Sequence, residues 1–532
     1  MAARRHPTTI SSPLLLAVVF VSGMTTLGVE ISASRLLGSF FGSSNIVWAN
    51  IIGLMLFYLT LGYYIGGRWA DRSPDPGLLF RLLLIAAGLC AFLPFLAHPV
   101  LQVAASALSE INGALALGSF FTVLLLFAVP ITLLGCVSPF AIRLAINELE
   151  HAGKISGSIY AVGTLGSLLG TFASALVLIP TFGTLQSFLI LAAALYLLAL
   201  YGLWRAVGNK AFRWLWVALL IAILTLMRLR GPLRPAPEGF LLLDETESAY
   251  NYVQVLADRA GTRYLHLNEG QGVHSIWHPT ERFFDGSWDF FLAAPYFNAP
   301  PFAPEQMKSL LIIGLAAGTI ARQHQAIYGD IPMTGIELDG EILALAASHF
   351  ELNEAAMPSL VTIPQDGRFA LRQLDQQFDA IAIDAYRPPY IPWHLTTVEF
   401  FKEARSLLSN EGVLAINVGR TSSDRRLVDA LAATLQQVFP SVHAVDVPNS
   451  FNSLLYASIK PTSPSNLQAN LRDLPADASP HLRRILELTV RSASPLRDGG
   501  IVFTDDLAPV EALVDSILLR FLFSQELEML RN

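Results

Sequence analysis

Three acidic residues stand at the ends of short apolar stretches in the C-terminal half of the chain. Glu337 follows the apolar part of "MTGIELD", Asp366 closes "LVTIPQD", and Asp384 closes "FDAIAID". If these stretches are strands of one buried parallel sheet, the carboxylates meet at the edge where such sheets bind ligands. An acidic side chain at the end of the second strand can accept hydrogen bonds from ribose hydroxyls. The pattern indicates a nucleoside site, although each carboxylate could instead cap the following helix, as Asp366 before "GRFAL" would.

A glycine-containing turn precedes these carboxylates, in the stretch "LLIIGLAAGTIARQ" that runs from Leu310 to Gln323. Gly314 and Gly318 bracket the turn, where glycine lets the backbone approach a ligand and adopt conformations that other residues avoid. The turn lacks the third glycine of the dinucleotide fingerprint, and the sequence contains no P-loop. No cluster of His and Cys suggests a metal, so we expect none. An adenosyl ligand remains, either S-adenosylmethionine or its decarboxylated form.

The elements that position these residues alternate between strand and helix over residues 301–460. Apolar strands between helices are typical of a parallel sheet covered on both faces, so we expect an α/β, Rossmann-like domain. Short alternating stretches before it, within residues 230–300, predict a linker and a small β-rich domain with hairpins. Residues 461–532 are expected to form a helical C-terminal tail.

The first 229 residues differ from the rest in composition. The whole chain is 53% hydrophobic and 14% charged, with a mean hydropathy of +0.49, whereas soluble domains carry about 25% charged residues. Six apolar blocks reach the roughly 20 residues that a spanning helix needs. We therefore predict a multi-pass α-helical transmembrane bundle of six or seven helices over residues 1–229, in the cell (inner) membrane. The blocks lie near residues 14–37, 46–66, 82–101, 114–140, 156–180 and 186–204.

Basic residues gather in alternate loops of this half. Arg68, Arg143 and Lys154 are among them, whereas the intervening loops contain no Lys or Arg. This bias places the N-terminus in the cytoplasm. A seventh apolar run, Trp214 to Met227, has 14 residues and basic flanks. If it crosses the bilayer, the C-terminal half lies outside. Its shortness and its flanks favour a cytoplasmic C-terminal domain, although a thin bilayer would tolerate a short span.

The remaining composition limits the possible partners. The net charge of −7 and the absence of a basic stripe argue against a nucleic-acid partner. Cys90 and Cys136 fall in apolar segments and are expected to be buried. Glu30, in the first apolar block, is either functional or part of the packing of the bundle. We expect a small nucleoside ligand and the lipid bilayer as partners, and a homo-oligomer is compatible with the sequence.

From Leu241 to Gly419 the chain resembles spermidine synthase, the family of polyamine aminopropyltransferases. The order and spacing of several motifs match those of the family throughout. Together with its membrane half, the chain is similar to multi-pass bacterial proteins that carry a fused synthase domain, which share a stretch like "FTDDLAPVEAL". The motifs are "ESAYNYVQV", "LHLNEGQGVHS", "IIGLAAGT", "GIELD", "QDGRFAL", "FDAIAIDAYRPP" and "HLTTVEFF".

This resemblance implies a small β domain, a Rossmann-like sheet of the S-adenosylmethionine-methyltransferase type, and a gate loop from Tyr386 to Pro392 over the active site. It assigns the ribose to Glu337, the adenine amino group to Asp366 and the reacting sulfonium to Asp384. By the same resemblance, Asp384 and Tyr386 are the catalytic residues. The further residues it assigns to cofactor binding are Gly314, Gly318, Gly367, and Asn251 and His274, which stand at the positions of two family glutamines.

Two acidic residues that the family uses to bind its amine substrate are absent. Ala317 stands at the position of an Asp in the glycine turn, and Arg387 at the position of a second Asp in the gate. Because cations repel one another in a partly buried site, putrescine is expected to bind poorly. Arg387 would instead suit the methionine carboxylate of intact S-adenosylmethionine. Asp505 and Asp506 would restore negative charge if the tail folded back, or would cap the following helix.

Three functions remain open from the sequence. The first is a membrane-anchored transferase that binds an S-adenosyl cofactor and transfers an aminopropyl or methyl group to an unknown acceptor. The second is a non-catalytic nucleoside-binding sensor on a membrane bundle, and the third is a transporter-like bundle with a regulatory domain. Loss of the amine carboxylates favours the second function over polyamine synthesis. Retention of Glu337, Asp366 and Asp384 favours continued ligand binding.

Overall fold

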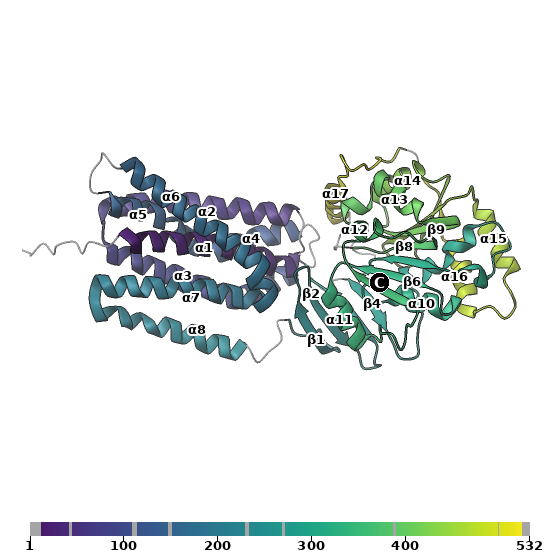
Figure 1. Ribbon diagram of the computed structural model, residues 1–532, viewed down its shortest axis with the longest axis horizontal. Coiled ribbons are helices and arrows are strands. Elements are labelled where there is room, and N and C mark those ends of the chain that lie inside the picture. Colours follow the sequence, from purple (N-terminus) through teal and green to yellow (C-terminus); the bar gives the residue numbers. More distant parts are fainter. Residues whose placement is uncertain are drawn as a thin grey trace, which may run out of the picture. The chain divides into compact units, whose positions relative to one another are not determined.

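The computed structural model describes residues 12–41, 45–108, 114–146, 152–228, 234–268, 272–386, 390–497 and 499–523. The chain divides into two compact units, Met1–Arg234 and Pro235–Asn532. Figure 1 shows the first unit as helices alone and the second as strands and helices. The expected helical N-terminal region and C-terminal α/β sheet are therefore confirmed.

The first unit is a bundle of long apolar helices joined by short connections. Small residues let two of these helices approach closely: a Cβ on Gly166 would lie 2.0 Å from the carbonyl oxygen of Phe20, and one on Gly170 2.1 Å from that of Met24. Such spacing is common where helices meet in membranes. The helices are α1 (Ser12–Phe41), α2 (Asn45–Arg72), α3 (Pro76–Leu108), α4 (Ala114–Gly135), α5 (Val137–Ala145), α6 (Ala152–Ala173), the π-helical segment η2 (Ser174–Leu178), α7 (Ile179–Val207), the 3-10 segment η3 (Gly208–Trp214) and α8 (Leu215–Arg228).

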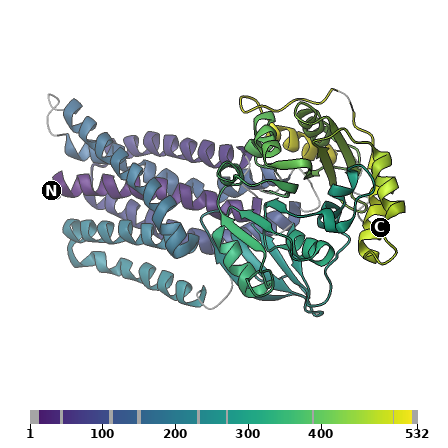
Figure 2. The same cartoon turned by 45° about the vertical axis from the view of Figure 1, so that its right-hand side comes forward.

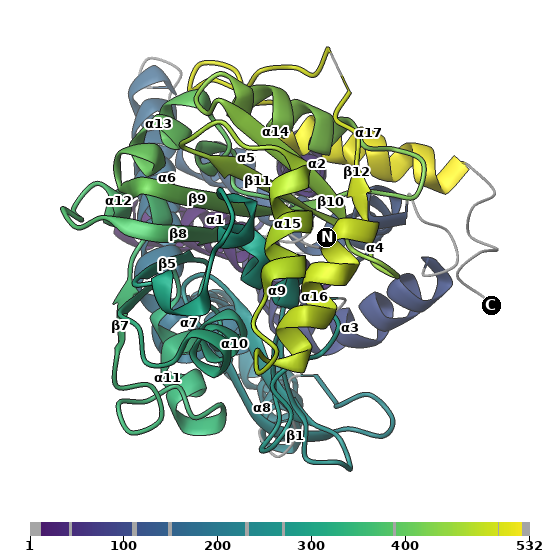
Figure 3. The same cartoon turned by 90° about the vertical axis from the view of Figure 1, so that its right-hand side faces the viewer.

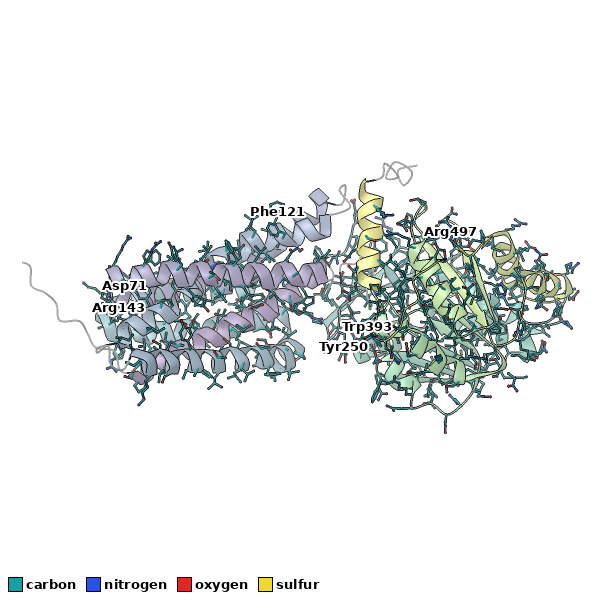
Figure 4. All side chains as sticks on the ribbon, turned by 90° about the horizontal axis from the view of Figure 1, so that it is seen from above. Asp71, Phe121, Arg143, Tyr250, Trp393 and Arg497 are labelled. Carbon is teal, nitrogen blue, oxygen red and sulfur yellow. The ribbon has the colours of Figure 1, made fainter. Side chains whose placement is uncertain are left out.

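Five helical stretches of this unit are long and apolar enough to cross a membrane, by length and composition alone. The last of them, Ala152–Leu226, contains more than one helix: two helices meet at Gly183, whose backbone is not helical, so the blocks predicted at 156–180 and 186–204 remain separate helices. Apolar side chains such as Phe121 on α4 also point away from the bundle, as Figure 4 shows. The other stretches are Ser12–Gly38, Ile46–Arg72, Pro76–Ala97 and Gly118–Ala145.

Polar contacts mark one end of the bundle. The Nε atom of Arg143 in α5 lies 3.2 Å from Oδ1 of Asp71 near the end of α2, and both side chains are exposed. Figure 4 shows the two side chains together at that end. These residues belong to the loops whose basic character predicts the cytoplasmic side.

The seventh apolar run forms α8, which has 14 residues. Figures 1 and 2 show α8 running beside α7 in the opposite direction, toward the end of the bundle at which α1 ends. Tyr196 of α7 donates a hydrogen bond to the carbonyl of Trp214, which holds the start of α8 against α7. At 1.5 Å per residue, α8 is about 21 Å long, whereas the hydrocarbon core of a bilayer is about 30 Å thick. The helix is therefore aligned with the bundle but is shorter than a full span.

The second unit begins with a small antiparallel sheet, as the alternating stretches predict. Its strand order is β1-β2-β3-β4. The inner strand β2 is almost wholly buried, because it pairs on both sides and its residues Val253 and Val255 face the core. The strands are β1 (Leu241–Glu247), β2 (Tyr252–Ala257), β3 (Arg263–Leu267) and β4 (Val273–Trp277).

An eight-stranded sheet follows, with strand order β12-β10-β11-β9-β8-β5-β6-β7. The strands β9, β8, β5, β6 and β7 pair in parallel, and β11, β10 and β12 add an antiparallel edge. The parallel part confirms the Rossmann-like prediction. The strands are β5 (Leu310–Ile313), β6 (Met333–Glu337), β7 (Leu360–Pro364), β8 (Phe378–Ile383), β9 (Leu408–Gly419), β10 (Ser441–Asp446), β11 (Asn452–Ser458) and β12 (Ala493–Ser494).

Helices cover both faces of this sheet. Leu310 and Ile312 of β5 pack in one core with α10, α11, α15 and α16, whereas Leu311 and Ile313 pack in the other with α12, α13, α14 and α17. Figure 3 shows α13 and α14 on one side and α10 and α11 on the other. The helices are α9 (Ser287–Phe290), α10 (Thr319–Tyr328), α11 (Gly340–His349), α12 (Gly367–Leu371), α13 (Val398–Ser406), α14 (Arg426–Gln436), α15 (Pro464–Asp473), α16 (Pro480–Arg491) and α17 (Val510–Phe523).

Residues 461–532 are more than the expected helical tail. They hold three helices, but they also supply the edge strand β12, which pairs with β10. Phe503, Val510 and Ile517 are buried in the core beneath α13 and α14. The segment therefore completes the sheet and contributes to one of its two cores.

Candidate functional site

A cavity of about 560 Å³ opens at the carboxyl ends of the parallel strands of the second unit. Glu337, Asp366 and Asp384 all line it, so the structure brings the three predicted carboxylates together. The exposed side chain of Tyr250, labelled in Figure 4, also lines it. Of the other predicted residues, Gly314, Gly367, Asn251, His274 and Tyr386 line this cavity, and Gly318 does not.

The glycine turn after β5 is held by backbone geometry. Gly314 has φ of +87°, and a Cβ on it would lie 2.5 Å from the carbonyl oxygen of Asp384. Gly318 has φ of +84°, precedes α10, and would place a Cβ 2.3 Å from the side chain of Leu352. Both positions therefore require glycine. Gly318 shapes the turn and is not among the residues that line the cavity, so its contact with a cofactor stays a prediction.

The carboxylate of Glu337 ends β6 and is held by the glycine turn. Its Oε2 accepts a hydrogen bond of 2.9 Å from the backbone N–H of Ala316, and its Oε1 accepts one of 3.1 Å from that of Asp339. Burial raises the pKa of Glu337 to about 7, although the N–H donors partly oppose this. Each oxygen keeps a lone pair, so the group can accept hydrogen bonds from two neighbouring hydroxyls.

Asn251 is tied into a polar network beside Glu337. Its Nδ2 donates to Oδ2 of Asp339 at 2.9 Å, and its Oδ1 accepts from Asn268 at 2.9 Å. Ser248 donates to the same Oδ2 at 2.5 Å, while Oδ1 of Asp339 caps α11. These contacts join the small sheet to the large one, and Asn251 reaches the cavity as a fixed wall residue.

Asp366 both caps a helix and faces the cavity, so the two roles that the sequence leaves open coexist. Its Oδ1 accepts hydrogen bonds of 3.0 Å from the backbone N–H groups of Arg368 and Phe369 at the start of α12. Its Oδ2 lies 2.8 Å from Nε2 of His394. Burial raises its pKa, but these donors and His394 outweigh burial and hold the pKa below the usual range. Asp366 is therefore ionised at neutral pH.

Asp384 follows β8 at the centre of the cavity. Its Oδ1 accepts a hydrogen bond of 2.9 Å from Nδ2 of Asn417. Burial raises its pKa to about 6, and the donors on Asn417 and Trp288 partly oppose that shift. A carboxylate with this pKa is mostly ionised at pH 7 and can still take up a proton.

Tyr386 lies in the same cavity as Asp384, but its hydroxyl is poorly suited to accept a proton. Its hydroxyl donates a hydrogen bond of 3.1 Å to the carbonyl of Asn417. Burial raises its pKa far above the ordinary value, and the charge of Asp384 adds to this. A neutral phenol that already donates its proton is a poor base, so we assign Tyr386 to the cavity wall. The next residues of the predicted gate, including Arg387, lie outside the described residues.

His274 lies in the wall formed by β4. Its Nε2 is buried and has no hydrogen-bond partner among the described residues. Burial, together with the neighbouring His266, lowers its pKa to about 4, so the ring is neutral at pH 7. A polar group of a ligand near this nitrogen would satisfy it.

Several functional candidates are missed by the sequence reasoning. Asn417 and Arg420 lie at the end of β9 on the same sheet edge, a position that the predicted strand "GVLAINVG" could have revealed. His394 and Trp288 reach the cavity from segments without strand periodicity. No local signal marks them, because their contacts with Asp366 and Asp384 bring together residues far apart in the chain.

Neither Asp289, which follows Trp288 of the cavity wall, nor Asp505 lines the cavity, so neither supplies a further carboxylate to it. Asp289 is fully buried and accepts a hydrogen bond from the backbone N–H of Asp285. Asp505 pairs with Arg368 at 2.7 Å and accepts from Thr397 at 2.7 Å. The sequence leaves two roles open for Asp505: to return negative charge to the site, or to cap a helix. In the structure Asp505 instead forms an ion pair that anchors the C-terminal segment.

Gly314→Ala tests whether the site depends on the close approach of β5 and β8. We expect it to lower the free energy of unfolding by about 2–4 kcal/mol, from left-handed strain and from the clash with Asp384. Gly261→Ala is the matched control, because Gly261 has the same φ of +87° but nothing lies within 4 Å of the position that its new methyl group would take. Chemical denaturation of both variants measures the difference, and equal losses would contradict the close approach.

Several known proteins resemble this chain in sequence, although no family model matches it. A probable polyamine aminopropyl transferase of Bifidobacterium longum is 32% identical over 287 residues, which cover 51% of this chain and 61% of that protein. Polyamine aminopropyltransferase 1 of Streptomyces coelicolor is 23% identical over 498 residues, 88% of each chain. Because neither unit alone makes up 88% of the chain, this second alignment includes residues of both units.

A solved spermidine synthase in complex with the transition state analogue AdoDATO aligns with 51% of this chain and 96% of its own, at 17% identity and a TM-score of 0.39. The chain spans about three fifths of the length of the first curated relatives, 61% and 60%. The names of the relatives agree with one another and with the motifs at the strand ends. These relatives thus support a spermidine synthase-like family for this chain, and those aligned by sequence are named polyamine aminopropyltransferases.

Proposed function

We propose that the second unit is a transferase that binds an S-adenosyl ligand in this cavity. The observation that carries the proposal is the convergence of Glu337, Asp366 and Asp384 on one cavity from the ends of β6, β7 and β8. Two of the three carboxylates have raised pKa values, which is characteristic of functional sites. The family relationship supports an aminopropyl or methyl group as the group transferred.

The two ends of a nucleoside fit different parts of the wall. Glu337 keeps one lone pair on each oxygen for the two ribose hydroxyls. Asp366 is ionised and lies beside His394, so it suits the amino group of adenine. The bare backbone at Gly314 lets the sugar approach the sheet edge closely. These assignments keep the roles that the family resemblance implies for Glu337 and Asp366.

Asp384 is the residue that we propose for the chemistry. An S-adenosyl ligand supplies an activated carbon beside a sulfonium, which a nucleophile on the acceptor can attack. The carboxylate of Asp384 would stabilise nearby positive charge, because burial strengthens their attraction. With a pKa of about 6 it would also accept the proton that the nucleophile loses. Asn417 fixes the orientation of this carboxylate.

A non-catalytic sensor remains the second candidate function. The observation that favours it is the absence of an amine-binding carboxylate in the described lining beyond Asp384. Ala317 is fully buried, donates its backbone N–H to Ser275 and does not line the cavity, so the position of the missing Asp presents no group to it. Binding of the ligand without any turnover would distinguish a sensor from a transferase.

We propose that the first unit lies in a lipid bilayer, with the N-terminus in the cytoplasm. Five apolar helical stretches of sufficient length and the position of the basic loops support this. The C-terminal unit must then also be cytoplasmic, because S-adenosyl ligands are cytosolic. This placement requires that α8 does not cross fully, and its length of 14 residues is compatible with a partial entry.

Isothermal titration of the full chain with methylthioadenosine tests the ligand site. We expect binding that strengthens between pH 6.5 and pH 8.5, because ribose hydroxyls donate to the ionised form of Glu337 and its pKa is about 7. Glu337→Gln should weaken binding at least tenfold, from the loss of a charged acceptor, and should flatten the pH dependence. Glu341→Gln, at an exposed position on α11, is the control. Affinity that is unchanged by E337Q, or constant over this pH range, would refute the assignment.

A reporter at the C-terminus tests the membrane arrangement. A fluorescent protein that folds only in the cytoplasm should be bright, because the proposed chemistry needs a cytosolic ligand. Alkaline phosphatase, which is active only outside, should be inactive at the same position. The reverse pattern would mean that α8 crosses, and it would place the second unit where no S-adenosyl ligand is supplied.

A further inference from the structure

The residues that line the cavity differ in charge and polarity on the two sides of β8, the strand that precedes Asp384. The carboxylates Glu337 and Asp366 follow β6 and β7, on one side of β8 in the sheet order. On the other side, the lining comes from the ends of β9 and β11 and from α14 and α17. Among the described residues of this second part, the lining contains no carboxylate. We call it the acceptor end; its apolar members are Leu427, Phe451, Val514 and Ile517.

A cation also lines the acceptor end. Arg420 follows β9, and its Nε donates to Oγ of Ser453 at 3.1 Å and lies 3.4 Å from Oδ1 of Asp446. Asp446 also pairs with Arg425. Two arginines therefore share one carboxylate, and their side chains are only 13% and 10% exposed. Arg420 therefore brings a guanidinium to the acceptor end in a partly desolvated place, where its charge is poorly screened.

The wall itself is built into the fold. Asp515 of α17 accepts a hydrogen bond of 2.5 Å from the hydroxyl of Tyr390. The chain before α17 is held by Phe503, which is fully buried, and by the ion pair of Asp505 with Arg368. Figure 3 shows α17 beside α14. Val514 and Ile517 are therefore presented to the cavity from a helix that is fixed at both its start and its middle.

A negative and a positive group line the same cavity. They are Asp384, which Asn417 holds, and Arg420, which follows Asn417 by three residues. A molecule with an amine near Asp384 could therefore place a carboxylate toward Arg420 and an apolar group against α14 and α17. The cavity of about 560 Å³ also has to hold the nucleoside, which limits this molecule to a small size.

Resting on the proposed function, we infer that the acceptor is a small apolar amino acid or a similar amine that bears a carboxylate. A diamine such as putrescine would meet the guanidinium of Arg420 with its second ammonium group, and no carboxylate of the described lining at the acceptor end would receive it. Guanidinium groups bind carboxylates well, often through two hydrogen bonds. The wall of Phe451, Val514 and Ile517 suits an aliphatic or aromatic side chain.

Titration of the full chain, first saturated with methylthioadenosine, tests this inference with three matched probes. Leucine carries the amine, the carboxylate and the apolar side chain, 3-methylbutylamine is the same molecule without the carboxylate, and putrescine is a diamine. We expect leucine to bind at least about tenfold more tightly than either amine, as for loss of a charged partner in a desolvated pair. Tighter binding of putrescine or of 3-methylbutylamine would overturn the inference. If methylthioadenosine itself does not bind, the proposed function fails first.

Two variants connect the preference to the acceptor end. Arg420→Gln should abolish the preference for leucine over 3-methylbutylamine while leaving the affinity for methylthioadenosine unchanged, which also shows that the variant is folded. Arg426→Gln is the control, because Arg426 pairs with Asp424 and does not line the cavity. Phe451→Ala, at a side chain that is 43% exposed, should weaken leucine severalfold. A preference for leucine that survives R420Q would exclude Arg420 as the binding group.

Discussion

Parallel pairing of β8, β5, β6 and β7 is the constraint on which the site depends. Ile313 of β5 stands opposite Ile336 of β6 and Ile383 of β8, so these strands end at nearly the same level. The residues that follow must then leave the sheet at one edge, where Glu337 and Asp384 face a common cavity. A shift of one residue in any strand would turn its carboxylate into a helix layer. The buried apolar faces of β5 forbid that shift, because either face would lose its packing.

Differences in environment give the three carboxylates different properties. Burial outweighs the hydrogen-bond donors at Glu337 and Asp384 and raises their pKa values to about 7 and about 6. Asp366 receives two backbone N–H groups and His394, and its pKa is lowered. One residue is therefore permanently charged and two can exchange a proton near neutral pH, which separates a fixed binding group from candidate acid–base groups.

The sequence alone predicts which residues stand at the strand ends, but it does not predict which residues line the other walls of the cavity. Glu337, Asp366 and Asp384 can be placed because apolar runs define strands and parallel strands share an edge. For Gly318 the sequence does not separate the two roles of a turn glycine, because a glycine needed for its φ and its close approach to Leu352 has the same local pattern as one that meets a ligand. Arg420, His394 and the wall of α17 depend on contacts between distant segments, such as Tyr390 with Asp515, which no periodicity encodes. The tail is expected as plain helix because a two-residue edge strand is too short to give a pattern.

Photolabelling of the full chain tests most directly whether these strand ends hold a nucleoside. The probe is methylthioadenosine with an azido group on adenine, followed by peptide mapping of the labelled sites. The account predicts labelling of the peptides that contain Asp366 and His394, with full protection by unlabelled methylthioadenosine. Labelling confined to the first unit, or labelling that the unlabelled nucleoside does not prevent, would contradict it.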